Sequence, residues 1–203
     1  MDNWMELLPR LVRQGHYLTT AELQRAGFGR VQIHWAERLF RFIRRVDRGL
    51  YVDAKAFPPL DVRWVVLHAR VPRGIVTLET AAASHGLLPW PGGPLWMALP
   101  HSEHPPRTSI GGLAFQYLRA PFSSEECEPF NPPGMPGLEL LRFVPLRVFA
   151  ELATARRMGA AEEVGRGLRE RGVPEADLAS ALAKRRVGSA TARRLLAATS
   201  RRP

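Results

Sequence analysis

Hydrophobic positions in the first 56 residues recur three times at helical spacing and then continue as two short β-prone runs. The three periodic segments predict helices at about 3–13, 22–26 and 29–40. Thr19, with Glu22 three residues later, forms a capping box at the start of the second helix. The runs FRFIRRV and GLYV stand on either side of Asp47-Arg48 and predict a hairpin.

The pattern changes after the paired prolines at 58 and 59, which mark a linker. It predicts a helix at 60–69, a helix at 78–86 with Thr77 as its N-cap, and strands in PLWMALP, GLAFQYLR and GLELLRFV. Four further helices are then predicted, each ending at a Gly or Pro break: 145–157, 160–171, 174–185 and 189–198. We therefore predict an α+β protein. Residues 1–56 form one domain, and residues 60–203 form a second with a small mixed sheet and a C-terminal helical bundle.

The third predicted helix has two different faces. At about 100° per residue, its apolar side chains fall on a side that we expect to pack inward: Ile33, Ala36 and Phe40. Its basic side chains fall together on another side: Arg30, His34, Arg38 and Arg41. In the preceding helix, Leu23 and Ala26 are expected to pack inward while Gln24 and Arg25 stay exposed. Three helices followed by a basic hairpin is the order of a winged helix-turn-helix.

The charge of the chain changes the picture further. The 203 residues carry 29 Lys and Arg against 19 Asp and Glu, a net charge of +10. The excess lies at the two ends, with 10 basic and 6 acidic residues in 1–58 and 13 and 6 in 146–203. Phosphates attract arginine whatever the nucleotide sequence, so this balance favours a nucleic-acid partner. A cationic surface also suits an acidic protein.

The second helix of a helix-turn-helix enters the major groove with its N-terminal residues against base edges. Arginine suits guanine and glutamine suits adenine in bidentate contacts, while arginines farther along meet phosphate. The predicted DNA-binding residues are Thr20, Arg25, Arg30, Val31, Gln32, His34, Arg38, Arg41, Arg44, Arg45 and Arg48. Against this stands the simpler interpretation that an arginine-rich helix face is only solvated.

The segment GHYLTTAELQRAGFGRVQIHWAERLFRFIRRVDRGLYV resembles the N-terminal winged helix of the AbiEi family of antitoxins. The motif positions are Thr19, Thr20, Glu22 and Leu23 at its start and Arg48, Gly49 and Tyr51 at its end. LETAAASHGLL resembles a helix of that family that ends in His-Gly-Leu, here His85, Gly86 and Leu87, and LWMALP resembles its proline-ended strand. Two places depart from the family pattern. Phe42 stands where a glycine usually closes the recognition helix, and Val148 and Glu151 follow Pro145 and Arg147 where Thr and Asp are usual.

The resemblance implies a cytoplasmic antitoxin of a type IV toxin-antitoxin system. Such a protein represses its own operon by binding inverted repeats in double-stranded DNA, and it counters a nucleotidyltransferase-like toxin without obligatory tight binding. Two alternatives remain. The chain is a standalone regulator whose second domain binds a ligand or a protein, or it is an RNA-binding module. The arginines of the C-terminal helices are either a solvated face or a second cationic surface for DNA, RNA or an acidic partner.

Enzyme and cofactor chemistry receive little support from the residues. A restriction-type nuclease needs an acid-x-Lys strand with an upstream acid, and only Asp53 with Lys55 has that spacing. His101, His104 and Glu103 share a polar loop without the further ligands that zinc requires. We therefore predict no catalytic residue, no cofactor and no metal. With no apolar run near the roughly 20 residues that span a bilayer, no export signal and a single cysteine, Cys127, we expect no membrane partner and a cytoplasmic location.

Overall fold

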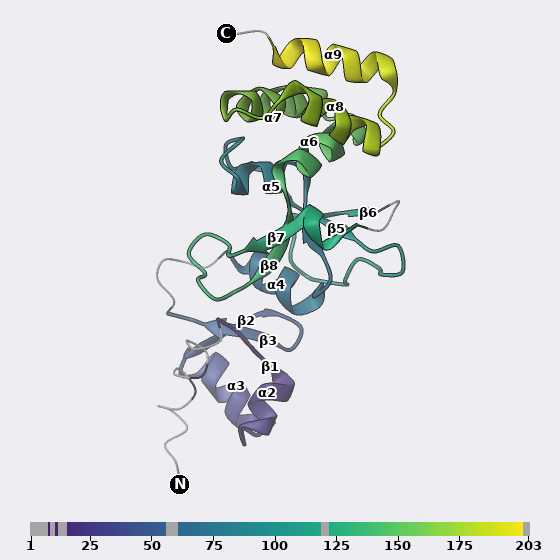
Figure 1. Ribbon diagram of the computed structural model, residues 1–203. Coiled ribbons are helices and arrows are strands. Elements are labelled where there is room, and N and C mark those ends of the chain that lie inside the picture. The colour runs from purple at the N-terminus through teal and green to yellow at the C-terminus, as the bar shows by residue number, and fades with distance from the viewer. Residues whose placement is uncertain (1–7, 9–10, 12–15, 56–60, 119–121, 201–203) are drawn as a thin grey trace. The chain divides into compact units, whose positions relative to one another are not determined.

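The computed structural model describes residues 8, 11, 16–55, 61–118 and 122–200 (Figure 1). Within these ranges the chain has eight α-helices and two small sheets, which confirms the predicted α+β class. None of the helices in these ranges is long and apolar enough to cross a membrane. The predicted linker at 56–59 and most of the predicted helix at 3–13 lie outside the described residues; Leu8 and Leu11 are helical.

The chain divides into two compact units that do not follow the sequence order. The first unit consists of three segments: the N-terminal part of the chain up to Pro72, Pro105–Gly112 and Asn131–Leu140. The second unit consists of the remaining segments: Arg73–His104, Leu113–Phe130 and Leu141–Pro203. In this division the first unit includes residues 61–72 and two loops from later in the chain, all of which the sequence pattern placed in the second domain.

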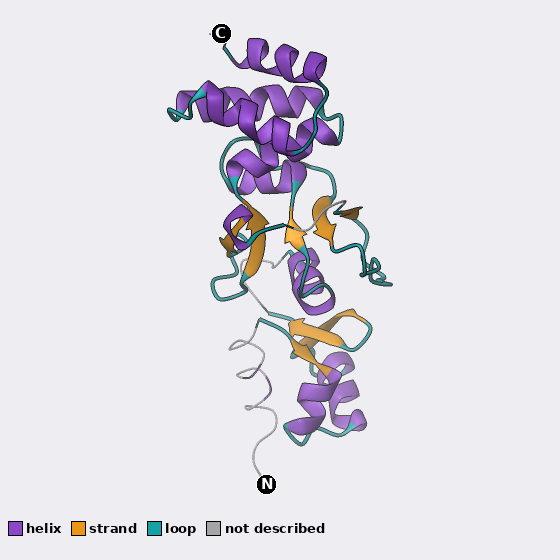
Figure 2. Ribbon diagram, turned by 45° about the vertical axis from the view of Figure 1, so that its right-hand side comes forward, coloured by secondary structure: helices purple, strands orange, loops and turns teal. Residues whose placement is uncertain are grey.

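The first unit contains a three-stranded sheet and helices (Figure 2). Its elements are β1 (Leu18–Thr19), α2 (Thr20–Arg25), α3 (Arg30–Arg38), β2 (Ile43–Asp47), β3 (Leu50–Asp53) and α4 (Val62–Arg70). The strand order is β1-β3-β2, and both pairs are antiparallel. The core between the sheet and the helices consists of Leu8, Leu23, Phe28, Ile33, Ala36, Ile43 and Tyr51. Burial of these apolar side chains is the main force that holds α2 and α3 against the sheet.

Two predicted core positions of the first unit are wrong. Ala26 is exposed because it is the C-cap of α2 and not part of its inner face. Phe40 is exposed because α3 ends at Arg38, so the helical spacing no longer applies to it. Its ring instead stacks on Phe42, with 5.6 Å between the ring centroids.

The second unit combines a five-stranded sheet with five helices (Figures 1 and 2). Its strands are β4 (Ile75–Val76), β5 (Leu95–Leu99), β6 (Leu113–Tyr117), β7 (Cys127–Phe130) and β8 (Leu140–Phe143, of which only Leu140 is counted with the first unit), in the order β6-β5-β4-β8-β7. Its α-helices are α5 (Leu78–Ser84), α6 (Pro145–Thr154), α7 (Met158–Glu170), α8 (Glu175–Lys184) and α9 (Ser189–Thr199). The β4 strand pairs parallel with β8 and antiparallel with β5, and β5 pairs parallel with β6.

Helix α6 is the centre of the helical layer, since it packs against α5, α7 and α8, while α9 packs against α7 and α8. The approach of α7 to α9 depends on Gly165. A Cβ there would clash with Thr199 and lie 2.9 Å from the Phe149 ring. Three helices therefore meet closely at a position where only glycine fits.

Two local predictions for the second unit need correction. Thr77 stands at the N-cap of α5, but its side chain makes no capping hydrogen bond; it accepts one from Gln116 at 3.4 Å instead. Among the C-terminal arginines predicted to be exposed, three are partly buried: Arg166, Arg169 and Arg185. Arg185 is drawn in by two carboxylates, as described below.

Candidate nucleic-acid interface

The connection between α2 and α3 is held by hydrogen bonds at both ends. Glu22 N donates to Thr19 Oγ1 at 3.2 Å and Thr19 N donates to Glu22 Oε2 at 2.7 Å, which confirms the predicted capping box. Thr19 Oγ1 also donates to Glu22 Oε2 at 2.7 Å, and the two hydrogen bonds that this carboxylate accepts from Thr19 lower the pKa of Glu22. After α2, Gly27 takes a left-handed φ of 89°, and Phe28 N donates to Leu23 O at 3.0 Å. The start of α3 is thereby fixed relative to α2.

The side chain of Gln32 is engaged at the start of α3. Its Oε1 accepts a hydrogen bond from Gly29 N at 2.7 Å, so Gln32 caps the helix that carries it. Bidentate recognition of adenine uses both the amide oxygen and the amide nitrogen. Gln32 can make that contact only if it gives up its capping hydrogen bond with Gly29 N. The capping role of Gln32 was not predicted from the sequence.

The exposed surface of α3 is divided between a basic row and an apolar row. Arg30, His34 and Arg38 are exposed, as predicted from their spacing. Beside them lies a row with large exposed fractions: Val31 at 59%, Trp35 at 44% and Leu39 at 68%. The methyl groups of Val31 stand next to the arginine row, where apolar contact with a thymine methyl is possible.

A left-handed arginine follows helix α3. Arg41, three residues after the last helical residue Arg38, has a φ of 50°, and Phe42 N donates to Ala36 O at 2.9 Å. The left-handed residue is therefore Arg41. Phe42, which stands where the family pattern has a glycine, is not left-handed. A non-glycine residue in this conformation costs about 1 kcal/mol. The side chain of this strained residue is exposed to solvent.

The hairpin of β2 and β3 turns at Arg48 and Gly49, one residue later than predicted. Gly49 has a φ of 67°, and its carbonyl accepts a hydrogen bond from Thr20 N at 2.9 Å. A Cβ on Gly49 would lie only 2.9 Å from Thr20 Oγ1. The turn is therefore docked against the first residue of α2, and Thr20 is half-buried there.

The last residue of β2, Asp47, fastens the hairpin to two other parts of the first unit. Its Oδ1 accepts hydrogen bonds from Ser109 N and Ser109 Oγ at 3.3 and 3.2 Å, and its Oδ2 lies 3.4 Å from Arg70 Nε on α4. Arg70 also donates to the carbonyl of Arg48. Burial raises the pKa of Asp47, but hydrogen bonds from Arg48 N and Ser109 outweigh it and the pKa is lowered. No sequence signal links these residues, since Ser109 is 62 positions away.

All eleven predicted DNA-binding residues lie in the first unit, on α2, α3, β2 and the connections that follow α3 and β2. Nine of them are exposed, and Thr20 and Gln32 are half-buried for the reasons given above. The arginines of β2, Arg44 and Arg45, are both exposed, and Arg45 Nε donates to Asp47 O at 3.2 Å. The predicted residues thus belong to a single compact unit.

The residues considered for metal or nuclease chemistry make local contacts. Asp53 Oδ1 accepts a hydrogen bond from Lys55 N at 2.8 Å, which is a turn interaction. His101 is exposed and meets Tyr117 edge to face, with 6.1 Å between the ring centroids. Within the described ranges, no group of three His, Cys, Asp or Glu side chains comes together.

The single cysteine, Cys127, is half-buried, and this burial raises the pKa of its thiol to about 11.

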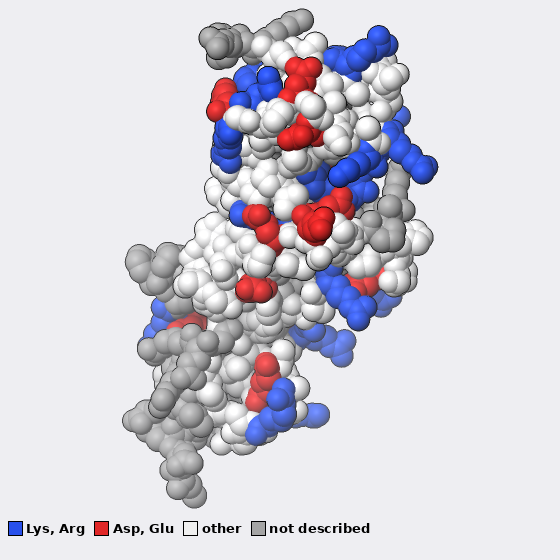
Figure 3. Space-filling view, in the orientation of Figure 1, with Lys and Arg blue, Asp and Glu red and all other residues white. Residues whose placement is uncertain are grey.

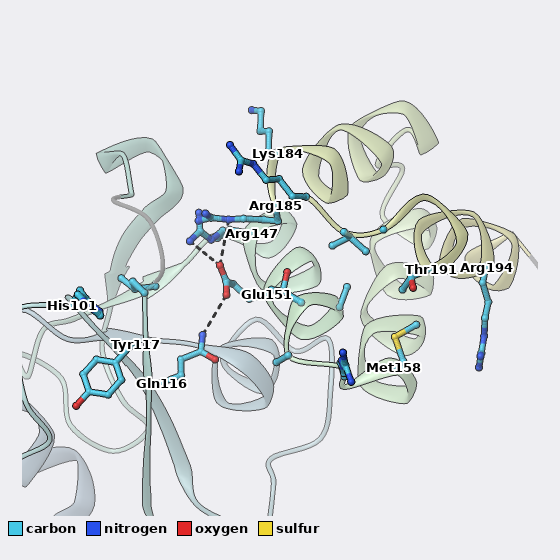
Figure 4. A pocket seen from close by; sticks show the side chains of 18 residues that line it. His101, Gln116, Tyr117, Arg147, Glu151, Met158, Lys184, Arg185, Thr191 and Arg194 are labelled. Atoms are coloured by element: carbon cyan, nitrogen blue, oxygen red, sulfur yellow. Dashed lines mark hydrogen bonds and ion pairs between the residues drawn. The ribbon is translucent and has the colours of Figure 1, made fainter.

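The second unit has a basic groove (Figure 4). Several of the arginines predicted for the C-terminal helices line it. Its volume is about 1570 Å³, and it is lined by β6 and by the ends of α6 and α8 together with the start of α9. We call it the cationic groove. Six of its 18 lining residues are basic and one, Glu151, is acidic. The basic residues are Arg147, Arg156, Lys184, Arg185, Arg186 and Arg194.

The floor of the cationic groove is a buried ionic network. Arg147, whose side chain is 4% exposed, contacts Glu126 at 2.8 Å and Glu151 at 2.7 Å. Arg185 Nε lies 3.3 Å from the same Glu151 carboxylate, and Arg185 Nη2 lies 3.9 Å from Glu126. Burial is the main reason that the pKa of Glu151 is raised, against the opposing effect of Arg147. Two arginines and two glutamates here balance, so any surplus positive charge comes from the groove's rim.

Comparisons with known proteins identify a similar fold but do not identify a family. No protein-family model matches the chain, and no curated protein sequence matches it either. Among solved structures, the chain is similar to the crystal structure of the RV2827C protein from Mycobacterium tuberculosis, with a TM-score of 0.53 and 16% identity over 100% of this chain and 84% of that one. At that identity the similarity indicates a shared fold.

Proposed function

We propose that the chain is a DNA-binding transcriptional repressor whose first unit is a winged helix-turn-helix. The observation that carries this proposal is the set of exposed arginines on α3 and β2. Arg30 and His34 stand in the first turns of α3, where a recognition helix meets base edges. In this proposal, Arg44, Arg45 and Arg48 of the hairpin supply further contacts to phosphate.

The rigidity of this surface supports the same proposal. Sequence-specific recognition needs a helix and a wing that keep their places relative to one another. Thr20 hydrogen-bonds to the hairpin turn, and Asp47 fastens the hairpin to Arg70 and Ser109. A solvated arginine face would not require such a support.

The biological role that we propose is that of an antitoxin in a type IV toxin-antitoxin operon. It rests on the sequence resemblance to the AbiEi family, above all on the motifs around Thr19, Arg48 and His85. In this proposal the repressor binds inverted repeats upstream of its own gene, and a nucleotidyltransferase-like toxin is encoded beside it. A standalone regulator with the same DNA-binding unit would lack that neighbouring gene.

A gel-shift experiment with DNA from upstream of the gene tests the repressor proposal. We expect a fragment with an inverted repeat to be bound in preference to a random duplex of the same length. The variant Arg30→Ala/Arg38→Ala should lose this preference, whereas Arg193→Ala, an exposed arginine of α9, serves as the matched control. Equal binding of both duplexes by the wild-type protein would refute sequence-specific repression. Co-expression with the neighbouring gene tests the antitoxin role separately, since rescue of growth is required.

A further inference from the structure

We propose that the cationic groove of the second unit binds a single-stranded nucleic acid, as a site separate from the duplex-binding surface of the first unit. The proposal goes beyond the repressor function and does not depend on it. It rests on four observations: the surplus charge of the groove, the arginines that end two of its helices, the buried donors of its floor, and the aromatic rings at one end.

The surplus charge is on the rim of the groove. Among the described residues, Arg156, Lys184 and Arg186 have no hydrogen-bond or ion-pair partner for their side chains, and all three are exposed. Arg194 lies 3.8 Å from Glu162 but remains 74% exposed. A hollow lined by charge of one sign concentrates counter-ions more strongly than a flat surface. Figure 3 shows Lys and Arg side chains gathered over the C-terminal helices.

Two helices that end in the groove carry arginine at a left-handed position that glycine would occupy with less strain. Five helices of the described chain end on a left-handed residue with the same pair of backbone hydrogen bonds. At three of them, α2, α5 and α7, that residue is glycine: Gly27, Gly86 and Gly172. At the other two, α6 and α8, it is arginine: Arg156 and Arg186.

Glycine adopts this conformation without strain, and arginine does not. Strained residues that persist in a fold are often found at functional sites. The two helix ends that carry arginine in place of glycine both line the cationic groove, which indicates that Arg156 and Arg186 are kept for the charge that they present.

The floor adds two buried donors that lack a hydrogen-bond acceptor. Arg147 Nε and Arg185 Nη2 donate no hydrogen bond among the described residues, although Arg185 Nη2 lies 3.9 Å from the Glu126 carboxylate. A buried donor without an acceptor is unfavourable, and an anionic oxygen in the groove would relieve it.

The shape and the aromatic rings select the class of anion. In Figure 4 the lining side chains extend from Tyr117 and His101 on one side, across Arg147, to Thr191 and Arg194 on the other. The volume of about 1570 Å³ exceeds that of usual small-ligand sites, which suits an extended chain. Tyr117 is 45% exposed and can stack a base, as single-strand sites do. In a duplex the bases are stacked within the helix and are not available to Tyr117.

The test uses the full chain carrying Arg30→Ala/Arg38→Ala, so that the duplex surface is disabled, and fluorescein-labelled oligonucleotides of two to eight nucleotides. We expect affinity to rise with length, for RNA, DNA or both, and Arg156→Gly/Arg186→Gly to weaken binding of the eight-nucleotide strand at least tenfold. The salt slope should fall by about 1.4 for the two lost phosphate contacts. Tyr117→Ala should weaken binding at least fivefold, and Arg193→Ala should have no effect.

The glycine variant keeps the test separate from folding, because glycine suits both left-handed positions. Its midpoint of thermal unfolding should be unchanged or higher while its affinity falls. The proposal is overturned if neither RNA nor DNA single strands bind, if the glycine variant binds as tightly as its parent, or if a nucleoside triphosphate or a duplex of the same length binds as tightly as the strand. Because the duplex surface is already disabled, failure here would leave the repressor proposal standing.

Discussion

The carboxylate of Asp47 accepts hydrogen bonds from both the N–H and the hydroxyl of Ser109, although the two residues are 62 positions apart. Asp47 closes the strand β2 that carries Arg44 and Arg45, and its other oxygen faces Arg70 of α4. The basic hairpin is therefore not a free arm. It is held by a helix and a loop from elsewhere in the same unit.

The first prediction concerns the strength of this anchor. Replacing Asp47, which is 4% exposed, by Ala removes the charged acceptor of two hydrogen bonds from Ser109 and the partner of Arg70, which should reduce the free energy of unfolding by about 1–3 kcal/mol. Urea denaturation measures the change. Arg44→Ala on the same strand is the control, since an exposed arginine should change the free energy by less than about 0.5 kcal/mol. Equal stability of the two variants would show that the anchor contributes nothing.

The same anchor predicts a dependence on pH. Since the pKa of Asp47 is lowered in the folded state, its carboxylate stabilises the fold above the usual aspartate pKa of about 4. This contribution should be lost as the pH falls from about 4 through the lower folded-state pKa. Denaturation of wild-type protein and Asp47→Asn between pH 7 and pH 3 measures it. The difference in unfolding free energy between the two proteins should shrink in acid; a constant difference would contradict the assignment.

A third prediction concerns the docking of the hairpin turn on α2. Gly49→Ala places a Cβ 2.9 Å from Thr20 Oγ1 at a residue with a φ of 67°, so it should destabilise the first unit by about 1–3 kcal/mol. Gly111→Ala is the matched control, because nothing lies within 4 Å of a Cβ there. Thermal unfolding compares the two. If Gly49→Ala unfolds at the same temperature as Gly111→Ala, the close contact is not structurally important.

A fourth prediction separates stability from DNA affinity at Arg41. Glycine suits the left-handed φ of 50°, so Arg41→Gly should raise stability by up to about 1 kcal/mol. The same change removes a phosphate-binding charge and should lower the salt slope for duplex binding by about 0.9. Calorimetry and a fluorescence titration measure the two effects. Loss of stability together with unchanged affinity would mean that Arg41 has a structural role instead.

Much of the helical content could be predicted from periodicity and from Gly and Pro breaks. The predictions at 145–157, 160–171, 174–185 and 189–198 all correspond to observed helices, because each has a continuous apolar stripe with a clear end. The strands β1 and β4 were missed because two residues are too few to show alternation. The pairing of β4 with β8 joins segments about 65 residues apart, which local patterns do not encode.

The candidate sites divide in the same way. Exposure of Arg30 and Arg38 followed from helical spacing alone. The capping role of Gln32 and the left-handed Arg41 could not be predicted, because both depend on where α3 begins and ends. The cationic groove could not be predicted either, since it is assembled from one strand and three helix ends whose order in space comes from the tertiary fold.

The measurement that tests the central claim most directly is the salt dependence of affinity for the inverted-repeat duplex. Fluorescence titrations of wild-type protein, Arg30→Ala/Arg38→Ala and Arg193→Ala should be made between about 50 and 200 mM salt, the range over which phosphate contacts are strongly screened. We predict that Arg30→Ala/Arg38→Ala lowers the slope of log affinity against log salt by about 0.9 for each of these arginines that contacts a phosphate, and that Arg193→Ala leaves it unchanged. Identical affinities and slopes for all three proteins would contradict the assignment of α3 as the DNA-binding surface.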